Sequence, residues 1–251
     1  MQSITVINIA SDELVNQAAH KMISCLSRLM SEDQALLFIG ELMNVSNFQR
    51  FIVLWLNSAS RNGRFNPVFQ NLFGGYFCQE AAHRCTQVTA SQELLHMAVD
   101  HYTKFLEDPE MDSEIRYFAQ WQLGLAYELL GFPWPDVEAT LLSASKYHND
   151  RGETMQHVIQ HYRATGGWSI GYIYSSITKD KFHDRLPADC ELFINPALYY
   201  WKIMYYHATI CSEIDLVLEK VDAYRKVYQY ALQHPNEFSE KQMSYFEQYK
   251  N

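Results

Sequence analysis

The chain has 251 residues, of which 48% are hydrophobic and 20% are charged, and its formal net charge is −9. This composition supports a sizeable core and excludes a disordered chain. Residues 1–90 hold six acidic and six basic side chains, so the whole acidic excess lies in residues 91–251. Because nucleic-acid binding needs a basic stripe that displaces counterions from phosphates, we expect no nucleic-acid partner.

The sequence also indicates whether the chain spans a membrane and in which cellular compartment it is expected. The longest apolar run in the first half, residues 51–56, is much shorter than the about 20 residues that a spanning helix needs. The first ten residues lack the basic start and apolar core of a secretory signal. The five cysteines are scattered and form no C-x-x-C pair, which favours buried reduced thiols. We expect a cytoplasmic protein with no membrane span and no cofactor.

Helical spacing of apolar residues dominates the chain, and strand-like alternation is confined to residues 1–10. In the N-terminal part the spacing predicts helices over about 11–29, 36–43, 48–56 and 68–88. A strong break precedes the last of these, where Gly63 permits a left-handed turn and Pro67 can open a helix. These segments match no repeat class, so we treat residues 1–90 as one N-terminal helical region.

From residue 91 onward the predicted helices follow one another closely. They cover about 91–106, 114–131, 135–147, a hairpin over 153–178, then 197–211 and 214–233, with an irregular stretch at 179–197. Asp112 and Ser113 are expected to cap the second of them. The last helix is predicted to bury one broad apolar face, formed by Ile214, Val217, Leu218, Val221, Tyr224, Tyr228, Ala231 and Leu232.

Residues 114–149 carry the pattern of a tetratricopeptide-like helical hairpin. The pattern is Leu123-Gly124-x-x-Tyr127 in the first helix and Val137-x-x-x-Leu141-x-x-Ala144 in the second. Its landmarks recur after about 34–35 residues, the length of one such repeat, at Tyr162, Gly166, Gly171 and Ser175. We therefore predict an all-α fold in which antiparallel helix hairpins stack as a tetratricopeptide-like α-solenoid, with residues 91–251 as the repeat region.

Several further segments carry a family resemblance over about residues 91–233. They are Arg116-Tyr117-Phe118-Ala119, Leu130-Gly131-x-Pro133-Trp134, Tyr162-Arg163 and Leu192-Phe193-Ile194. They resemble the helical-repeat segments attached to some bacterial family 2 glycosyltransferases. The resemblance implies a chain that serves beside a glycan-assembling enzyme. It does not extend to the transferase activity, since the chain lacks both the strand–helix alternation and the Asp-x-Asp motif of the catalytic domain.

The most suggestive catalytic constellation is formed by His148, Asp150, His157 and His161. His157 and His161 are spaced to share one helix face, but the glutamate of H-E-x-x-H is absent, because Val158 follows His157. Solvated or hydrogen-bonded histidines are the ordinary alternative. We expect no nucleophile elbow of the G-x-S-x-G type, and no Walker loop or G-x-G-x-x-G pattern occurs. We therefore predict no catalytic residues and no metal ligands here.

The repeat register predicts a partner-binding strip. If Leu123, Gly124 and Tyr127 face the paired helix, then Trp121, Leu125 and Glu128 lie on an adjoining strip, outside the packing of the paired helices. The equivalent positions one repeat later are Gln156, Gln160 and Arg163. In tetratricopeptide-like stacks this strip lines the concave groove. We therefore predict that Trp121, Glu128, Gln156, Gln160 and Arg163 contact a partner, an ordinary solvated face being the alternative.

A second group of residues suits carbohydrate. Tyr199-Tyr200-Trp201 and Tyr205-Tyr206 place five rings on one short helix, where they either stack on sugars or pack in the core. The leading hypothesis is a non-enzymatic adaptor or scaffold that binds a protein segment in its groove. The alternative is an accessory module of glycan synthesis that binds a carbohydrate or a glycosyltransferase. A metal-dependent enzyme is the third hypothesis.

Overall fold

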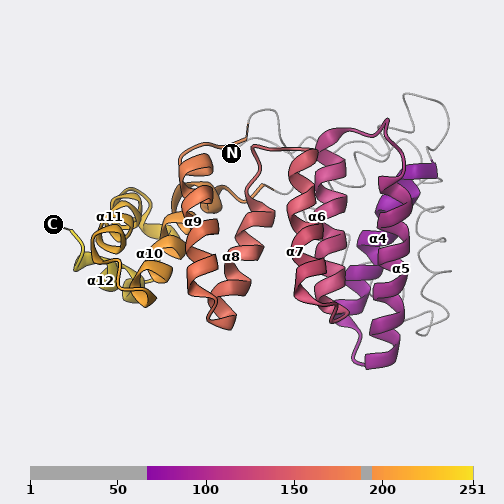
Figure 1. The fold of residues 1–251 in the computed structure, drawn as a ribbon, viewed down its shortest axis with the longest axis horizontal. Coiled ribbons are helices and arrows are strands. Elements are labelled where there is room, and N and C mark those ends of the chain that lie inside the picture. The colour runs from indigo at the N-terminus through magenta and orange to yellow at the C-terminus, as the bar shows by residue number, and fades with distance from the viewer. Residues whose placement is uncertain (1–66, 188–193, 251) are drawn as a thin grey trace. The chain divides into compact units, whose positions relative to one another are not determined.

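The computed structural model describes residues 67–187 and 194–250, and every regular element in them is a helix (Figure 1). The all-α prediction is confirmed for these residues. The helices predicted over 11–29, 36–43 and 48–56 lie outside the described residues. The chain divides into two compact units: unit 1 ends at Pro109, and unit 2 runs from Glu110 to Asn251.

The described part of unit 1 is a pair of helices, α4 (Pro67–Arg84) and α5 (Val88–Leu106). The two pack along each other, and Leu94, Ala98, Tyr102 and Phe105 of α5 are buried. Pro67 opens α4, as its fixed φ favours. The predicted boundary between residues 90 and 91 falls inside α5. Because α5 packs on α4, the two helices belong to one compact unit, which ends at Pro109.

Unit 2 is a succession of helices in which each packs against its neighbours in the chain. Figure 1 shows them following one another from α6 to α11. They are α6 (Ser113–Leu129), α7 (Trp134–Ser143) with the 3-10 turn η1 (Ala144–Lys146), α8 (Glu153–Thr165), α9 (Trp168–Phe182), the π-helix η2 (Leu198–Lys202) running into α10 (Ile203–Glu213), α11 (Val217–Gln233), η3 (Pro235–Glu237) and α12 (Glu240–Glu247). The helix α8 also contacts α10. This consecutive packing is the arrangement of an α-solenoid.

Local sequence signals explain where these helices begin and end. Asp112 caps α6, because its Oδ1 accepts hydrogen bonds from the backbone N–H groups of Glu114 (2.9 Å) and Ile115 (3.4 Å). Gly131 and Gly166 follow α6 and α8 with φ of 77° and 78°, a left-handed conformation that glycine adopts without strain. The two glycines occupy equivalent landmark positions of the predicted repeat, so the two turns share one backbone conformation.

The predicted close approach at Gly124 is present. A Cβ atom at this position would lie 2.6 Å from Cδ2 of Leu141, whose side chain is fully buried. Leu141 forms a buried cluster with Val137 and Val158, and Tyr127 packs against it. The landmark residues of the first hairpin therefore serve helix packing.

A charged network is buried where the chain passes from the first hairpin into the second. The Arg151 side chain is buried; its Nε lies 3.1 Å from Oε2 of Glu153, and its Nη1 lies 3.5 Å from Oε1 of Glu114. The guanidinium also covers the ring of Tyr117 at 4.5 Å. Arg151 thus joins the turn before α8 to the first helix of the preceding hairpin.

The C-terminal part of unit 2 departs from the prediction. The helix α9 extends to Phe182, and α11 starts at Val217. In α11 the buried residues are Ala223, Tyr224, Val227 and Ala231, whereas Val217, Leu218 and Leu232 of the predicted face are exposed. Val217 lies at the helix end, and the other two are turned away from the buried stripe. The helix α12, which the sequence reasoning missed, buries Phe246 against Tyr224.

Candidate functional site

The side chains of the predicted partner-binding strip continue onto α10. We call this surface the α6–α8–α10 strip and define it by Trp121, Leu125, Glu128, Gln156, His157, Gln160, Arg163 and Tyr206. Trp121 and His157 face each other edge to face, with ring centroids 6.4 Å apart. The alternate helices α6 and α8 thus share one surface.

Trp121 is more deeply placed than its repeat position predicts. The ring is half-buried and packs against the cluster of Val137, Leu141 and Val158, as does Leu125. The indole Nε1 is buried and has no hydrogen-bond partner. The expectation that Trp121 lies outside the helix packing is therefore wrong in part, because its large ring, in the middle of α6, reaches both the core and the surface.

The α8 residues of the strip converge on one tyrosine of α10. The Nε2 groups of Gln156 and Gln160 donate hydrogen bonds to the Tyr206 hydroxyl at 3.2 and 3.0 Å. The Arg163 guanidinium lies 4.9 Å from the centre of the same ring. Glu128, at the end of α6, is exposed. Burial raises the pKa of Tyr206, so its phenol stays neutral at physiological pH.

The predicted histidine constellation is not brought to one point. The Nδ1 atom of His148 pairs with the Asp150 carboxylate. His161 instead stacks flat on Trp134, with ring centroids 3.4 Å apart, and His157 contacts Gln160 through Nδ1 at 3.4 Å. These side chains are engaged separately, so their sequence proximity does not become a shared ligand set.

The aromatic group of η2 and α10 is largely used in packing. Tyr199 is fully buried, and its hydroxyl accepts a hydrogen bond from the Gly152 backbone N–H at 3.0 Å. Trp201 packs on Phe238 with ring centroids 4.9 Å apart. Tyr200 stacks on Tyr230 at 5.8 Å. Most of these rings therefore hold helices together.

The pattern of a nucleophile elbow, whose absence was expected, is present between α8 and α9. Residues 167–171 read Gly-Trp-Ser-Ile-Gly, the G-x-S-x-G spelling of a nucleophile elbow. That elbow needs a strand before the serine, whereas here the helix α8 precedes it, and Ser169 is exposed in the first turn of α9. A Cβ atom at Gly167 would lie 2.6 Å from the Tyr162 ring, and one at Gly171 would meet Tyr162 Cβ at 3.3 Å. Packing against Tyr162 explains both glycines.

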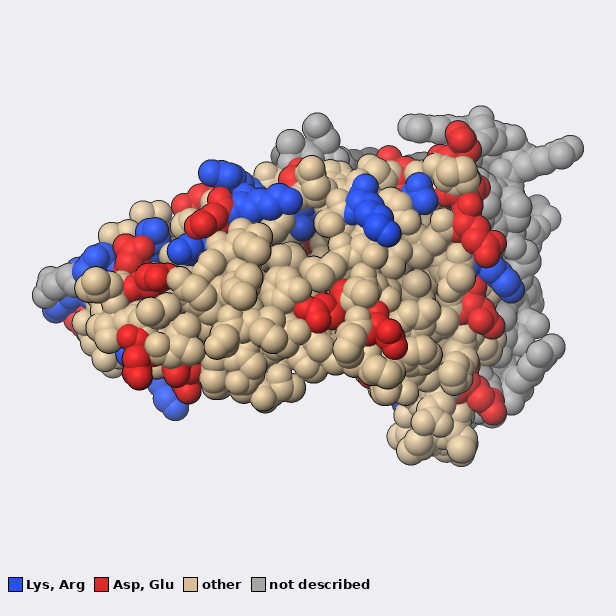
Figure 2. Space-filling view, in the orientation of Figure 1, with Lys and Arg blue, Asp and Glu red and all other residues tan. Residues whose placement is uncertain are grey.

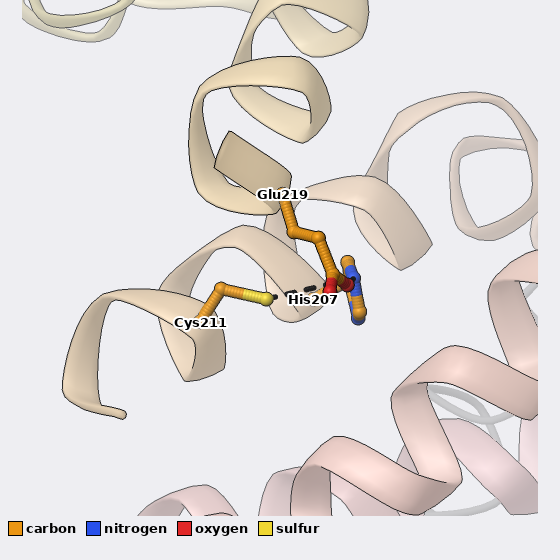
Figure 3. Close-up of side chains that lie close together, drawn as sticks. All are labelled: His207, Cys211 and Glu219. Atoms are coloured by element: carbon orange, nitrogen blue, oxygen red, sulfur yellow. Dashed lines mark hydrogen bonds and ion pairs between the residues drawn. The ribbon is translucent and has the colours of Figure 1, made fainter. Parts of the chain in front are cut away.

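A second group of chemically active side chains lies between α10 and α11. His207 and Cys211 are one helical turn apart on α10, which puts them on one face. Asp215, with φ of 57°, lies in the tight turn after α10, and this turn brings Glu219 in the first turn of α11 beside them (Figure 3). One ligand atom from each residue lies within 4.8 Å of the others. We call this group the His–Cys–Glu cluster.

Helix α9 supplies the surroundings of the His–Cys–Glu cluster. The Oγ atom of Ser175 lies 2.9 Å from His207 Nδ1, and the Lys179 Nζ atom lies 3.5 Å from His207 Nε2. The Tyr172 hydroxyl donates to the Glu219 carboxylate, 3.0 Å from Oε1 and 3.1 Å from Oε2. The cluster is therefore assembled from three successive helices.

Burial sets the charge of the cluster. It raises the pKa of the Cys211 thiol to about 11, with the Glu219 carboxylate adding to the effect. It also lowers the pKa of His207, in the same direction as the neighbouring Lys179. Cys211 therefore carries its proton at neutral pH and is a poor nucleophile. The sequence signal for this cluster was the H-x-x-x-C spacing on a predicted helix, but Glu219 joins it only through the fold.

Charged groups are mixed over the face seen in Figure 2. There, the described Lys and Arg side chains lie in small groups next to Asp and Glu and do not form a continuous stripe. No helix among the described residues is long and apolar enough to cross a lipid bilayer. No protein-family model matches the chain, and no curated protein or solved structure is significantly similar to it.

Proposed function

We propose that unit 2 is a tetratricopeptide-like, non-enzymatic adaptor that holds a segment of another protein along the α6–α8–α10 strip. The observation that carries the proposal is the continuity of this strip. Trp121 contacts His157, His157 contacts Gln160, and Gln160 donates to Tyr206, so three alternate helices share one surface. Alternate helices of stacked hairpins line the same side, which is where helical-repeat proteins bind extended partners.

The chemistry of the strip suits a peptide. Amide, imidazole and phenol groups offer hydrogen bonds to a peptide backbone, and the half-buried indole of Trp121 offers an apolar anchor. Exposed Glu128 and half-buried Arg163 lie in the last turns of α6 and α8, and they give the strip charges of both signs. These charges favour a partner segment that carries both signs.

The test is site-specific photo-crosslinking with the full chain as bait. A photo-reactive residue at Glu128 is expected to crosslink to a defined peptide of a partner protein. The same residue at Ile173, on the exposed side of α9, is the matched control and is expected to give no crosslink to that peptide. Crosslinking from position 173 to the peptide, with none from position 128, would refute the assignment of the strip.

Charge reversal provides a second readout. Glu128→Lys together with Arg163→Glu is expected to weaken capture of the crosslinked partner at least tenfold, because both partner contacts become repulsive. The melting temperature is expected to change little, because Glu128 is exposed and Arg163 half-buried. Capture at full strength by this folded variant would place the binding surface elsewhere. Capture that free glycan elutes would instead favour an accessory module of glycan synthesis.

A further inference from the structure

The His–Cys–Glu cluster brings together the side-chain types that hold zinc in proteins. His207 and Cys211 are almost completely buried, whereas the Glu219 side chain is 40% exposed. Imidazole nitrogen, thiolate sulfur and carboxylate oxygen are the three ligand types of Zn²⁺ sites. The adaptor function proposed above has no use for this cluster, which lies between α10 and α11 and contacts α9.

The separations within the cluster fit a tetrahedral ion. The Nε2 atom of His207 lies 3.2 Å from Glu219 Oε2 and 3.5 Å from Cys211 Sγ. A tetrahedral Zn²⁺ with bonds of about 2.0–2.3 Å holds nitrogen, oxygen and sulfur ligands about 3.4–3.6 Å from one another. Both distances from His207 lie within a few tenths of an ångström of these values. The Cys211 sulfur and a Glu219 oxygen lie within 4.8 Å of each other, and rotation of the half-exposed Glu219 side chain brings them to the tetrahedral separation.

The hydrogen bonds around His207 are compatible with the tautomer that a ligand histidine needs. The Ser175 hydroxyl donates its proton to the Tyr172 carbonyl oxygen at 3.1 Å. The same hydroxyl oxygen then accepts a hydrogen bond from His207 Nδ1, which carries the imidazole proton. In this tautomer Nε2 is an acceptor that faces the Glu219 carboxylate and the Lys179 ammonium group. Orientation of a ligand histidine through its other nitrogen is usual at metal sites.

We propose that His207 Nε2, Cys211 Sγ and one Glu219 carboxylate oxygen bind Zn²⁺, leaving a fourth coordination position for water or another ligand. Binding exchanges the thiol proton of Cys211 for the Zn–S bond, and the proton leaves to solvent. The ion enters from the side of Glu219, the most exposed of the three ligands. Lys179, 26% exposed and 3.5 Å from His207 Nε2, weakens the site, because the exchange adds one positive charge beside its ammonium group.

Cobalt spectroscopy tests the proposal directly. The full chain, stripped with a chelator, is titrated with Co²⁺, which is expected to produce thiolate-to-cobalt absorption in the near ultraviolet that one equivalent of Zn²⁺ abolishes. Cys211→Ser is expected to lack this absorption, and Cys85→Ser, a half-buried thiol of unit 1, is expected to keep it. Absence of the absorption in the folded wild-type protein, or equal absorption in both variants, would mean a hydrogen-bonded cluster only and would overturn the proposal.

Two further variants test the site should Cys211→Ser fail to fold. Glu219→Gln removes a half-exposed ligand and is expected to weaken Zn²⁺ binding, measured by competition with a chromophoric chelator, by at least about tenfold. Lys179→Met is expected to strengthen binding by about five- to tenfold. Lys181→Met, on the same helix and outside the cluster, is the control and is expected to leave the affinity unchanged. Unchanged zinc affinity in both Glu219→Gln and Lys179→Met would refute the ligand assignment.

Discussion

Replacing Gly124 with alanine tests the packing of the first hairpin, because the effect is expected to change sign with the residue at position 141. In the wild-type chain the new methyl group would lie 2.6 Å from Leu141 Cδ2 and 2.8 Å from Cγ. Overpacking of this kind costs about 1–3 kcal/mol, and the higher helix propensity of alanine offsets about 1 kcal/mol of it. We expect Gly124→Ala to destabilise unit 2 by up to about 2 kcal/mol.

Leu141→Ala removes the atoms responsible for the clash. Alone, it opens a cavity at a fully buried position and is expected to cost about 2–5 kcal/mol. In this background the backbone nitrogen of residue 141, at 3.4 Å, becomes the nearest of these atoms to the methyl group of Gly124→Ala, which fills part of the cavity. Gly124→Ala is then expected to stabilise unit 2 by about 1 kcal/mol, which gives a coupling energy of about 1–3 kcal/mol.

Urea unfolding followed by tryptophan fluorescence measures this coupling in the full chain. Four of the five tryptophans, at positions 121, 134, 168 and 201, lie in unit 2, so the signal reports mainly on that unit. Gly131→Ala is the control, because it strains a left-handed backbone with no atom near the added Cβ and is expected to cost about 1 kcal/mol in both backgrounds. An equal effect of Gly124→Ala in both backgrounds would refute the packing argument.

Two other predictions concern charge. Arg151→Met is expected to lower the free energy of unfolding by about 3–5 kcal/mol, because it leaves the buried Glu153 carboxylate without its cation. The same urea assay measures this loss, and adding Glu153→Gln to the variant is expected to recover part of it. A loss below about 1 kcal/mol would contradict the network. Burial lowers the pKa of His157 despite the opposing charge of Glu128. The unfolded chain therefore protonates this imidazole more readily than the folded chain does. The histidine's contribution to stability is lost as the pH falls below about 6.5. We expect His157→Gln to flatten the decline in unfolding free energy between about pH 7 and pH 5. The control is His96→Gln, at an exposed position. An unchanged pH dependence in His157→Gln would contradict this assignment.

Local signals in the sequence determined the helical character of the described residues and most helix boundaries. Asp112 caps its helix, Pro67 opens one, and Gly131 and Gly166 adopt the left-handed turns that end two others. Each of these effects acts over a few residues along the chain, so spacing and residue type suffice to predict it. The close approach at Gly124 was also predictable, because the repeat pattern encodes which position faces the paired helix.

Only the tertiary structure decided which side chains meet. The cluster of His207, Cys211 and Glu219 depends on the turn around Asp215 and on the packing of α9. Arg151 forms an ion pair with Glu114 across the junction between two hairpins. Trp121 likewise reaches the core because of the helices around it. A periodic pattern specifies which face of a helix a residue occupies. Which residue it contacts across that face depends on how the helices pack, because ridges and grooves from distant segments must fit together.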